Sequence, residues 1–353
     1  MHDKACDILV VGAGPAGASA ARKAALSGAY VLLAEQRDVV GVPVQCAEFI
    51  PKFLFGKIEM DKSVIAQSVK GMETYVNGAF EVFTRAPGYV IHRDRFDQAL
   101  VKAAEDAGAQ VMMGARAVDL EKDGAVILKC KNKELIKIQP RIIIGADGPR
   151  SKVGQWVNAG NAHLLPGAQV SLALTQPMEH TEVHFHPAIY AGYGWVFPKG
   201  DAANVGVGFR NDPGSGARAF KILENFVSFL KKEGKVKGNP IRSAAGWIPA
   251  QAVRKAVYGR IALVGDAAGH THPITGAGIF AAVTGGQMAG KWAGRAVMEN
   301  DESLLQKYDE EWLDLMGDTL KRAHRRRQEM ESHWRDFNDV IKRCWIAFRA
   351  YYE

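Results

Sequence analysis

Residues 6–35 read CDILVVGAGPAGASAARKAALSGAYVLLAE, and this stretch decides the fold. The short apolar run at 6–12 contains β-branched residues and predicts a buried strand. The Ala-rich segment 15–28 predicts a helix, and residues 30–35 predict a second buried strand. Strand, glycine turn, helix and strand together form a βαβ unit.

The turn of this unit has the spacing GxGxxG at Gly12, Gly14 and Gly17. Gly12 makes the tight turn, Gly14 lets the backbone approach a pyrophosphate, and Gly17 permits close packing of helix on strand. Pro15 and Ala16 open the helix, whose free N–H groups attract phosphate. This arrangement predicts a dinucleotide site.

Glu35 ends the second strand, 18 residues past Gly17, and Gln36 follows it. A carboxylate at this place accepts hydrogen bonds from both ribose hydroxyls and disfavours a 2′-phosphate. The alternative interpretation is a glycine-rich turn with a surface glutamate.

Two further strands deliver an aspartate at their carboxyl ends, where ligands bind in open α/β sheets. Residues 144–151 read IGADGPRS and contain Asp147, and residues 261–269 read IALVGDAAG and contain Asp266. Asp266 can accept hydrogen bonds from a polyol chain, while Gly276 and Gly278 open another helix N-terminus. Either aspartate can instead cap a helix.

The rest of the chain alternates between strand-like and helical segments. We expect strands within 64–91, 110–119, 125–138, 141–147, 165–250 and 260–266. We expect helices at 94–107, 217–233, 276–299 and throughout the tail from 303.

The three motifs together resemble the FAD-binding set of the flavoprotein hydroxylase and reductase superfamily, from residue 6 to about residue 295. In that superfamily the first motif holds the ADP half of FAD, the aspartate of the third contacts the ribityl chain, and the glycines after it lie beside the flavin ring. The resemblance therefore implies FAD as the cofactor. The implied contacts are Gly12, Gly14, Pro15, Ala16, Gly17, Glu35, Gln36, Cys46, Ala47, Arg93, Ala117, Asp147, Asp266, Gly276, Gly278 and Ile279.

Three segments resemble one branch, the geranylgeranyl reductase family. Residues 43–48, PVQCAE, resemble its cysteine loop, residues 193–200, YGWVFPKG, its YxWxFPKG signature, and residues 92–100 its R-x-x-F-D-x-x-L segment. Gly269 and Ile279 also stand where aromatic hydroxylases usually have His and Asn. The loop lacks the family's usual Gly after the cysteine and the chain is short for the family, so the substrate stays open.

These observations predict an α/β protein with a Rossmann-type FAD-binding domain, an inserted antiparallel β-sheet substrate domain and a C-terminal helical tail. We expect a discontinuous FAD-binding domain at 1–160 and 250–300, which includes part of the sheet near 64–91. The substrate domain is expected at 161–249 and the helical region at 301–353.

The resemblance implies that reduced FAD delivers hydride to one carbon of an isoprenoid double bond, while a side chain or water protonates the other. Cys46, Tyr193 and Trp195 are the candidate catalytic residues. Tyr193 and Trp195 belong to an aromatic strand that either walls an apolar pocket or fills the sheet core. Cys46 either contacts the flavin, acts as a redox-sensitive thiol or is an inert buried residue. The sequence assigns no proton donor.

Histidines alternate at His180, His184 and His186, and only Glu182 shares their parity as a further ligand type. We interpret these as ordinary sheet histidines and predict no metal site. His270 and His272 flank the flavin loop and can tune it.

The 353 residues include 45 basic and 38 acidic side chains, and a net charge of +7 gives little support for nucleic acid. The four cysteines form no CxxC pair, which indicates reduced thiols and a cytoplasmic setting. We expect no signal peptide, and the longest uncharged run, 267–290, contains Pro273 and six glycines and is no membrane span.

Without a second dinucleotide motif, electrons must come from transiently bound NADPH or a protein donor such as ferredoxin.

The tail combines the basic segment KRAHRRR at 321–327 with an apolar stripe at helical spacing. The stripe consists of Trp334, Phe337, Ile341, Trp345, Phe348 and Tyr352. Such a helix either lies on an anionic membrane surface, which suits a lipid substrate, or packs on the protein's own body.

The leading hypothesis is an FAD-dependent reductase of the geranylgeranyl reductase type that acts on a small apolar prenyl or lipid substrate. A flavin monooxygenase acting on an aromatic or protein-borne group is the alternative. Within it a halogenase fits less well, because residues 194–198 match its WxWxIP signature only in half. A third hypothesis is a flavin-bound electron-transfer or assembly partner without its own substrate.

Overall fold

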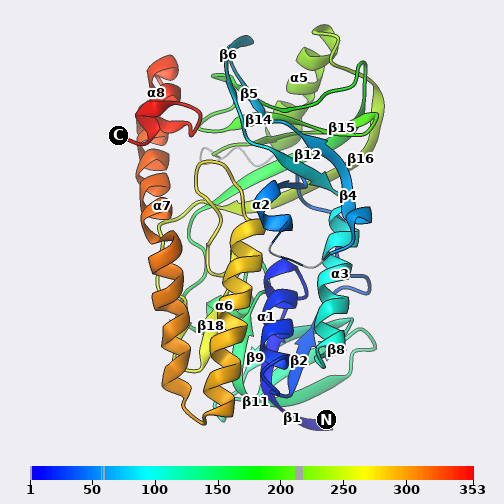
Figure 1. The fold of residues 1–353 in the computed structure, drawn as a ribbon, viewed down its shortest axis with the longest axis vertical. Coiled ribbons are helices and arrows are strands. Elements are labelled where there is room, and N and C mark those ends of the chain that lie inside the picture. The colour runs from blue at the N-terminus through cyan, green and yellow to red at the C-terminus, as the bar shows by residue number, and fades with distance from the viewer. Residues whose placement is uncertain (1, 57, 59, 211–217) are drawn as a thin grey trace. The chain divides into compact units, whose positions relative to one another are not determined.

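A computed structural model describes residues 2–56, 58, 60–210 and 218–353. The chain has an α/β fold (Figure 1) and divides into two compact units. Unit 1 comprises Met1–Val42, Asp94–His163 and Gln251–Lys321. Unit 2 comprises Pro43–Arg93, Leu164–Ala250 and Arg322–Glu353.

The chain passes between the two units after residues 42, 93, 163, 250 and 321. The strands at 64–91, which the sequence analysis assigned to the FAD-binding domain, belong to unit 2. The reason is that β5 (Met72–Val76) extends the sheet of unit 2 by pairing in parallel with β13 (Thr181–Phe185). Residues 322–353 of the expected helical tail also belong to unit 2.

Unit 1 is built on a sheet with the strand order β17-β18-β11-β1-β2-β8. Five of these strands run parallel: β1, β2, β8, β11 and β18. Two further strands extend the sheet, since β10 pairs with β11 and with β9. Its strands are β1 (His2–Val11), β2 (Val31–Ala34), β8 (Gln110–Met112), β9 (Ala115–Leu120), β10 (Val126–Cys130), β11 (Leu135–Gly145), β17 (Val257–Tyr258) and β18 (Ile261–Leu263). Its helices are α1 (Pro15–Ala25), α3 (Arg93–Asp106), α4 (Lys152–Trp156), η2 (Gly265–Ala267), α6 (Ile279–Met298), η3 (Glu302–Leu305) and the first part of α7 (Gln306–Ser332).

Two expected strands of unit 1 are divided differently in the structure. The run 110–119 is broken at Gly114, whose φ of +65° ends β8 and begins β9. The runs 125–138 and 141–147 instead form β10 and one long strand, β11, with a turn at Lys133.

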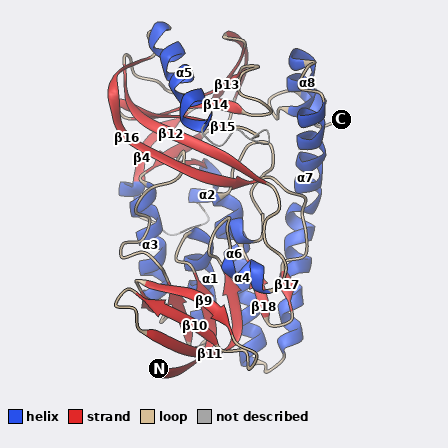
Figure 2. Cartoon of the chain, turned by 180° about the vertical axis from the view of Figure 1, so that it is seen from behind, coloured by secondary structure: helices blue, strands red, loops and turns tan. Residues whose placement is uncertain are grey.

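Helices α1 and α6 lie side by side in unit 1 (Figures 1 and 2) and approach without intervening side chains. A Cβ built on Gly286 would lie 2.2 Å from the carbonyl oxygen of Ala16. A Cβ on Gly290 would lie 2.2 Å from that of Ala20. The glycine spacing of α6 therefore sets how closely it packs on the helix that follows the first glycine turn.

Unit 2 contains a seven-stranded sheet of order β16-β12-β15-β14-β13-β5-β6 and a three-stranded sheet of order β3-β7-β4. The larger sheet is antiparallel except at the β13–β5 pair. Its strands are β5, β6 (Ala79–Thr84), β12 (Leu164–Leu174), β13, β14 (Tyr193–Lys199), β15 (Ala202–Gly208) and β16 (Val236–Pro249). The strands of the smaller sheet are β3 (Phe49–Pro51), β4 (Ile65–Val69) and β7 (Gly88–Ile91). The helices of unit 2 are α2 (Lys52–Phe55), η1 (Lys62–Val64), α5 (Arg218–Lys232), α8 (Phe337–Cys344) and η4 (Arg349–Tyr351).

Helix α5 covers one face of the larger sheet. Its Leu223, Phe226 and Leu230 are buried against alternate residues of β12, β14 and β15. The first residue of the expected helix 217–233 lies outside the described residues. Since side chains alternate along a strand, Tyr193 and Trp195 project from the opposite face to Val196.

Four residues of the tail's apolar stripe, Trp334, Phe337, Ile341 and Trp345, are buried within unit 2, whereas Phe348 is half-buried and Tyr352 is 57% exposed. Ile341 and Trp345 are almost fully buried, and the Trp345 indole donates a hydrogen bond to Thr74 Oγ1 at 3.0 Å. The Trp334 indole likewise donates to the carbonyl oxygen of Pro187 at 3.1 Å. The expected continuous helix also stops after α7 and resumes only as the short α8.

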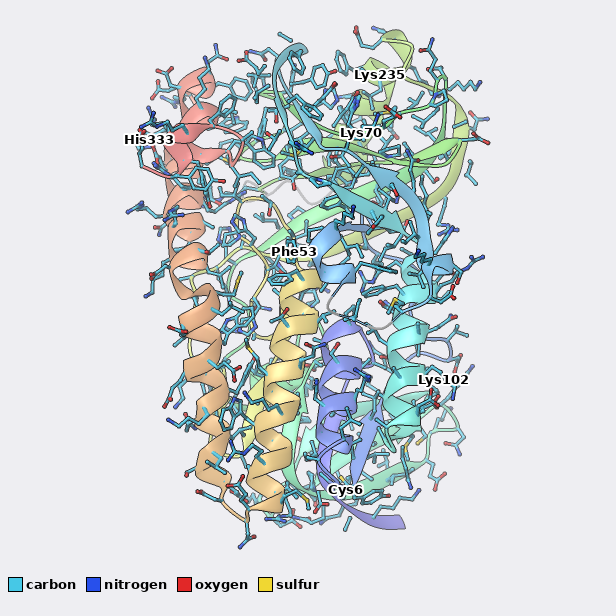
Figure 3. The ribbon with its side chains drawn as sticks, viewed as in Figure 1. Cys6, Phe53, Lys70, Lys102, Lys235 and His333 are labelled. Carbon is cyan, nitrogen blue, oxygen red and sulfur yellow. The ribbon has the colours of Figure 1, made fainter. Side chains whose placement is uncertain are left out.

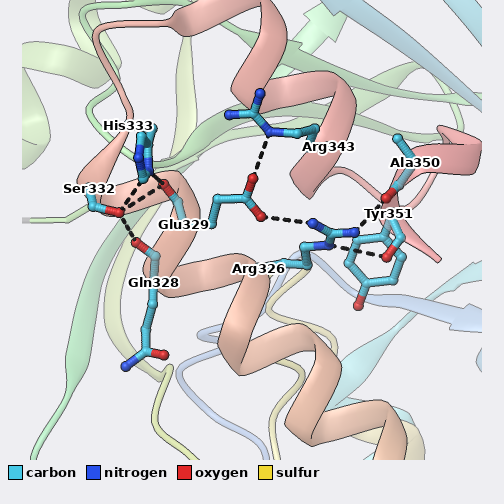
Figure 4. A network of polar contacts seen from close by, with 8 residues as sticks. All are labelled: Arg326, Gln328, Glu329, Ser332, His333, Arg343, Ala350 and Tyr351. Carbon is cyan, nitrogen blue, oxygen red and sulfur yellow. Dashed lines mark hydrogen bonds and ion pairs between the residues drawn. The ribbon is translucent and has the colours of Figure 1, made fainter. Parts of the chain in front are cut away.

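Several basic side chains of the tail are held by internal partners (Figure 4). Glu329 accepts hydrogen bonds from Arg326 at 2.8 Å and from Arg343 at 2.6 Å. Arg326 also donates to the carbonyl oxygens of Ala350 and Tyr351. This network joins the end of α7 to α8 and the last residues of the chain.

No helix in the described part of the chain combines the length and the apolar character that crossing a membrane requires.

We predict that Gly290→Ala destabilises the protein by about 1–3 kcal/mol, because the new methyl group must displace the backbone of α1. This cost opposes the helix propensity of alanine, which by itself favours the substitution. Urea unfolding measures the change. Gly160→Ala is the matched control, since the nearest atom to its added Cβ lies at 3.8 Å. Equal stability of the two variants would contradict the packing argument.

Candidate functional site

The predicted nucleotide-binding residues of unit 1 gather at one edge of its parallel sheet. Strands β1, β2, β11 and β18 all run in the same direction, so their carboxyl ends meet at that edge. The residues that follow these strand ends are Gly12, Glu35, Asp147 and Asp266. Cys6 lies near the other end of β1 (Figure 3) and is remote from this edge.

The first glycine turn has the geometry of an anion cradle. Gly12 has a φ of +100°, and a Cβ on Gly17 would lie 1.8 Å from the carbonyl oxygen of Gly12. Among the described residues, none has a heavy atom within 4 Å of a Cβ built on Gly14. Helix α1 begins at Pro15 with no side-chain cap and no acidic residue in its first turn. Its N–H groups are therefore open toward a phosphate, and the residues fit the pyrophosphate of a dinucleotide.

Glu35 is fixed at the end of β2. One carboxylate oxygen accepts a hydrogen bond from the Ala13 N–H at 2.8 Å, and the other accepts from the Arg37 N–H at 2.9 Å. Its backbone pairs with Met112 and Ala115, at the ends of β8 and β9. Each carboxylate oxygen retains a further lone pair, so the group fits a ribose diol.

Two further predicted cofactor contacts of unit 1, Gln36 and Ala117, differ in exposure. Gln36 is exposed, whereas Ala117 is buried on β9 and pairs with Leu128 of β10.

Asp147 serves a structural purpose in the described residues. Its carboxylate accepts hydrogen bonds from Ser151 Oγ and from the N–H groups of Lys152 and Val153, at 2.5, 2.6 and 3.1 Å. Burial raises the pKa of this carboxyl group, although these hydrogen bonds oppose the shift. The helix-capping alternative therefore describes what this carboxylate does at α4.

Asp266 and the glycines after it form a second polar edge. Asp266 Oδ1 accepts a hydrogen bond from Thr271 Oγ1 at 2.6 Å, and its carbonyl oxygen accepts one from the Asn161 side chain at 2.7 Å. A Cβ on Gly278 would lie 3.3 Å from Asp266 Oδ1, so the start of α6 is next to this carboxylate. Gly276 has a φ of +64°, and Ile279 begins α6 without a side-chain cap before it.

His270 is a buried imidazole in the same loop. It is 1% exposed, stacks on Trp312 with ring centroids 4.0 Å apart, and has no hydrogen-bond partner on either ring nitrogen among the described residues. Burial, together with the nearby Arg254, lowers the pKa of His270 to about 3. Burial lowers the pKa of His272 to about 4. Both rings are therefore neutral at physiological pH.

The cysteine loop is tied to the sheet of unit 2. Glu48, which is 2% exposed, accepts hydrogen bonds on Oε2 from Lys199 Nζ and from the Asn204 side chain, each at 2.7 Å. Its Oε1 accepts from the Arg93 N–H at 3.0 Å. Asn204 also donates to the carbonyl oxygen of Ala47 at 3.2 Å. The structure thus brings the cysteine loop, the R-x-x-F-D segment and the FPKG segment together on one carboxylate.

Cys46 is a free, partly buried cysteine in this loop. Its Sγ accepts a hydrogen bond from the Glu48 N–H at 3.2 Å, and its carbonyl oxygen accepts one from the Gln169 side chain at 2.7 Å. Burial raises the pKa of the Cys46 thiol, while the Arg93 guanidinium and the hydrogen bond from the Glu48 N–H oppose this increase and the Glu48 charge adds to it. The thiol therefore keeps its proton at neutral pH.

Tyr193 and Trp195 belong to an aromatic cluster of unit 2. The ring centroid of Tyr193 lies 6.1 Å from that of Trp195, 5.8 Å from that of Phe185 and 5.3 Å from that of Trp345. Burial raises the pKa of Tyr193. The Trp195 indole lies over Gly206, and its buried N–H has no partner among the described residues.

Glu182 joins the alternating histidines in a polar cluster under α5. Glu73, His180 and Glu182 each place a ligand-type atom within 4.8 Å of the others. The Lys235 ammonium supplies a positive charge to this cluster, because Nζ donates a hydrogen bond to Glu182 Oε1 at 2.5 Å. Glu182 Oε2 is hydrogen-bonded to His184 Nε2 at 2.8 Å. Lys235, labelled in Figure 3, lies just after α5.

Sequence reasoning missed the polar partners that hold the candidate residues in place. These are Glu48, Lys199, Asn204 and Gln169 in unit 2, and Thr271 and Asn161 in unit 1. A signal was present for Glu48 and Lys199, since both are charged residues inside segments that carry the family resemblance.

Comparisons with known proteins show which family and which fold the chain shares. Residues 68–323 match the model of an FAD binding domain, and residues 10–57 match that of an NAD(P)-binding Rossmann-like domain. A digeranylgeranylglycerophospholipid reductase of Methanothrix thermoacetophila is 36% identical over 342 residues, covering 90% of this chain and 85% of that protein. An FAD binding domain model and 85% of the length of this relative therefore align with the chain.

Solved structures give the same fold. A geranylgeranyl bacteriochlorophyll reductase-like protein from Thermoplasma acidophilum superposes with a TM-score of 0.87 at 28% identity, over 98% of this chain and 92% of that chain. An aklavinone-11 hydroxylase, solved with FAD and aklavinone, superposes with a TM-score of 0.72 at 21% identity, over 95% of this chain and 71% of its own. The second likeness concerns the fold alone.

We predict that acid destabilises the protein partly through His270. An imidazole with a folded pKa of about 3 is neutral in the native state, while the unfolded chain binds a proton below about pH 6.5. Its contribution to stability is therefore complete above pH 6.5 and is lost as the pH falls. Between pH 7 and pH 5 the loss is on the order of 1–2 kcal/mol.

Replacing His270 by Phe retains a ring on Trp312 but removes the titration. The variant is expected to lose less unfolding free energy than the wild type between pH 7 and pH 5, as measured by urea denaturation. His333→Phe, at an exposed position, serves as the control. Parallel pH profiles for the wild type and His270→Phe would exclude this role.

Proposed function

Because the chain belongs to the FAD-dependent geranylgeranyl reductase family, we propose that it reduces carbon–carbon double bonds in the prenyl chains of a lipid. The observation that carries this proposal is the alignment of nearly the whole chain with digeranylgeranylglycerophospholipid reductases, at 36% identity for the relative from Methanothrix thermoacetophila. The open glycine cradle and the anchored Glu35 support FAD as the cofactor.

The residues of unit 1 suit the ADP half of FAD and the chain that leads to its ring. The N–H groups at the start of α1 would bind the pyrophosphate, and Glu35 would accept from the adenosine ribose. Asp266, held by Thr271, would accept from the ribityl hydroxyls, and Gly278 leaves room beside it. When bound, FAD supplies the hydride chemistry of the reaction.

Unit 2 supplies candidate groups for the apolar substrate and for a proton. Tyr193 and Trp195 lie on the sheet face opposite α5, where Trp195 is 8% exposed and Tyr193 packs against Trp345. We propose that these aromatic side chains wall the isoprenoid chain. Cys46 holds a proton on Sγ at neutral pH, because burial raises the pKa of its thiol. We propose that this loop orients the substrate double bond and that Cys46 is the group that can hold the transferred proton.

The external reductant is proposed to be transiently bound NADPH or a protein donor such as ferredoxin. Gly206 and Gly208 lie inside β15 rather than in a strand-to-helix turn, so they do not form a second dinucleotide cradle.

The structure favours no second function. The hydroxylase likeness rests on the fold alone, whereas the relatives from Methanothrix thermoacetophila and Methanosarcina acetivorans, at 36% and 34% identity, are digeranylgeranylglycerophospholipid reductases.

We predict that Glu35→Gln weakens FAD binding by about tenfold to a hundredfold, since a charge-assisted hydrogen bond contributes about 1.5–3 kcal/mol. Fluorescence titration of the apoprotein with FAD measures the dissociation constant. Glu105→Gln on the exposed side of α3 is the control and is expected to bind like the wild type. Unchanged affinity in Glu35→Gln would remove the ribose role from this carboxylate.

We also predict that a prenyl lipid reoxidises the reduced holoenzyme without oxygen. The purified protein is loaded with FAD, reduced anaerobically with dithionite, and mixed with geranylgeranyl diphosphate or a geranylgeranylated glycerophospholipid. Recovery of oxidised flavin absorbance together with a product heavier by two hydrogens per bond is the expected result. Reoxidation only after air is admitted, with an oxygen atom in the product, would reject reductase chemistry in favour of a monooxygenase.

A further inference from the structure

We propose that Arg242 on β16 binds a phosphate group, and that this phosphate is the charged end of the prenyl substrate. This inference deepens the proposed function, because it places the polar end of the substrate, and it rests on that function for the prenyl part of the ligand. All the residues that carry it belong to unit 2.

A small hollow lies between the cysteine loop and strands β12, β15 and β16. Its lining includes the polar residues Glu48, Gln169, Ser171, Asn204, Arg242 and Ser243. The enclosed part measures about 10 Å³, which is room for one water-sized group such as a single phosphate oxygen. The rest of a bound phosphate would therefore lie at the mouth of the hollow.

Arg242 carries the uncompensated charge of this hollow. Glu48 is the other charged residue of the lining, and the Lys199 ammonium lies 2.7 Å from its carboxylate. Arg242 is exposed, and among the residues that the structure describes its guanidinium has no hydrogen-bond or ion-pair partner. A planar guanidinium can donate two parallel hydrogen bonds to one phosphate, so this side chain suits that anion.

Gln169 adds a buried atom that lacks a partner. Its Nε2 donates to the carbonyl oxygen of Cys46 at 2.7 Å, whereas its Oε1 is buried and accepts no hydrogen bond within the described part of the chain. Because buried polar atoms are almost always hydrogen-bonded, this oxygen indicates that a donor from outside the protein enters the hollow. A water molecule that bridges to a bound phosphate is such a donor.

The strand register places Arg242 on the same sheet face as the aromatic side chains of β14. Residues that pair directly across neighbouring strands point to one face. One such row consists of Phe197, Asn204, Ser171 and Arg242. This is the face opposite α5, because the alternate residues of β12, β14 and β15 pack under that helix. Three strand spacings, roughly 14 Å, separate the two ends of the row.

An apolar surface lies next to this row on the same face. The parallel row that begins at Tyr193 continues through Gly208, Gly167 and Gly246. A Cβ on Gly208 would lie 3.5 Å from Ile248 and 3.5 Å from Trp195, so apolar side chains cover these glycines. An isoprenoid chain that crosses the strands would therefore keep apolar contacts while its phosphate reaches Arg242.

The test measures binding to the oxidised, FAD-loaded protein, in which no reduction takes place. Isothermal titration calorimetry in one detergent buffer compares geranylgeranyl diphosphate, geranylgeraniol and inorganic pyrophosphate. For Arg242→Gln we expect the Kd of geranylgeranyl diphosphate to rise about tenfold to a hundredfold, because charge-assisted hydrogen bonds are lost. The Kd of geranylgeraniol is expected to stay within about twofold of the wild-type value.

Lys231→Gln is the matched control, because it removes the same charge from the exposed side of α5, which covers the other sheet face. It is expected to bind all three compounds like the wild type. Arg242→Lys keeps the charge without the planar fork, and its Kd for geranylgeranyl diphosphate is expected to lie between those of the wild type and Arg242→Gln. Flavin absorbance and urea unfolding report whether each variant is folded and retains its cofactor.

Three results would overturn the proposal. The first is an unchanged Kd of geranylgeranyl diphosphate in Arg242→Gln, and the second is an equal loss for geranylgeraniol. The third is the same loss in Lys231→Gln, which would indicate a general charge effect. If the wild type binds pyrophosphate as tightly as geranylgeranyl diphosphate, the site takes free phosphate, and its assignment to the substrate is wrong.

The same titrations separate this inference from the proposed function. Pyrophosphate binding that depends on Arg242, in a protein that binds neither prenyl compound, would keep the phosphate site and reject the prenyl substrate. Anaerobic reduction of a prenyl lipid by the wild type, together with unchanged affinities in Arg242→Gln, would reject the role of Arg242 alone.

Discussion

Backbone-to-backbone contact without side chains is the constraint on which unit 1 depends. Gly17 lets the first helix approach the turn after β1, Gly12 lets that turn approach Ala146 after β11, and at Gly286 and Gly290 helix α6 approaches α1. At each of these four glycines a Cβ would lie 2.5 Å or less from a backbone oxygen, and for Gly17 this distance is 1.8 Å. A side chain at any of them would push α1 away from its place, and with it the N–H groups that face a phosphate. The nucleotide site is thus a consequence of how closely the elements pack.

Unit 2 is organised by a different principle, in which polar atoms define the site and apolar ones fill the space. Its larger sheet buries an aliphatic core under α5, while the opposite face carries Tyr193, Trp195 and the attachments of the cysteine loop. A buried carboxylate is costly unless it is paired and hydrogen-bonded, and Glu48 accepts hydrogen bonds from three donors, one of them the Lys199 ammonium. Directional hydrogen bonds of this kind specify one conformation of the cysteine loop. Apolar contacts, which have no preferred direction, would allow the loop several conformations.

Much of the fold could be predicted because local patterns and global contacts agree. Gly12, Gly14 and Gly17 followed by Glu35 define the βαβ unit almost alone, and the strand ends at Asp147 and Asp266 follow from buried apolar runs. The parallel pairing of β5 with β13 could not be predicted, because register between segments about 100 residues apart leaves no periodic signal. The left-handed backbone at Glu48 was equally hidden, since glycine is the usual residue there. For Asp147, one sequence pattern suits both a ligand and a helix cap, and only the contacts distinguish them.

The parallel β13–β5 pair has a consequence for how the chain is made. Hairpin β5–β6 leaves the ribosome about 100 residues before β13 exists, so one edge of β5 waits without its partner during synthesis. An open strand edge can pair with another nascent chain, and β6 adds the exposed aromatic side chains of Phe80 and Phe83 to that hazard. The β5–β13 pair can therefore form only after these further residues have been added, and such non-local pairing is slow. Expression at low temperature, or in the presence of a chaperone that shields strand edges, suits a chain of this topology.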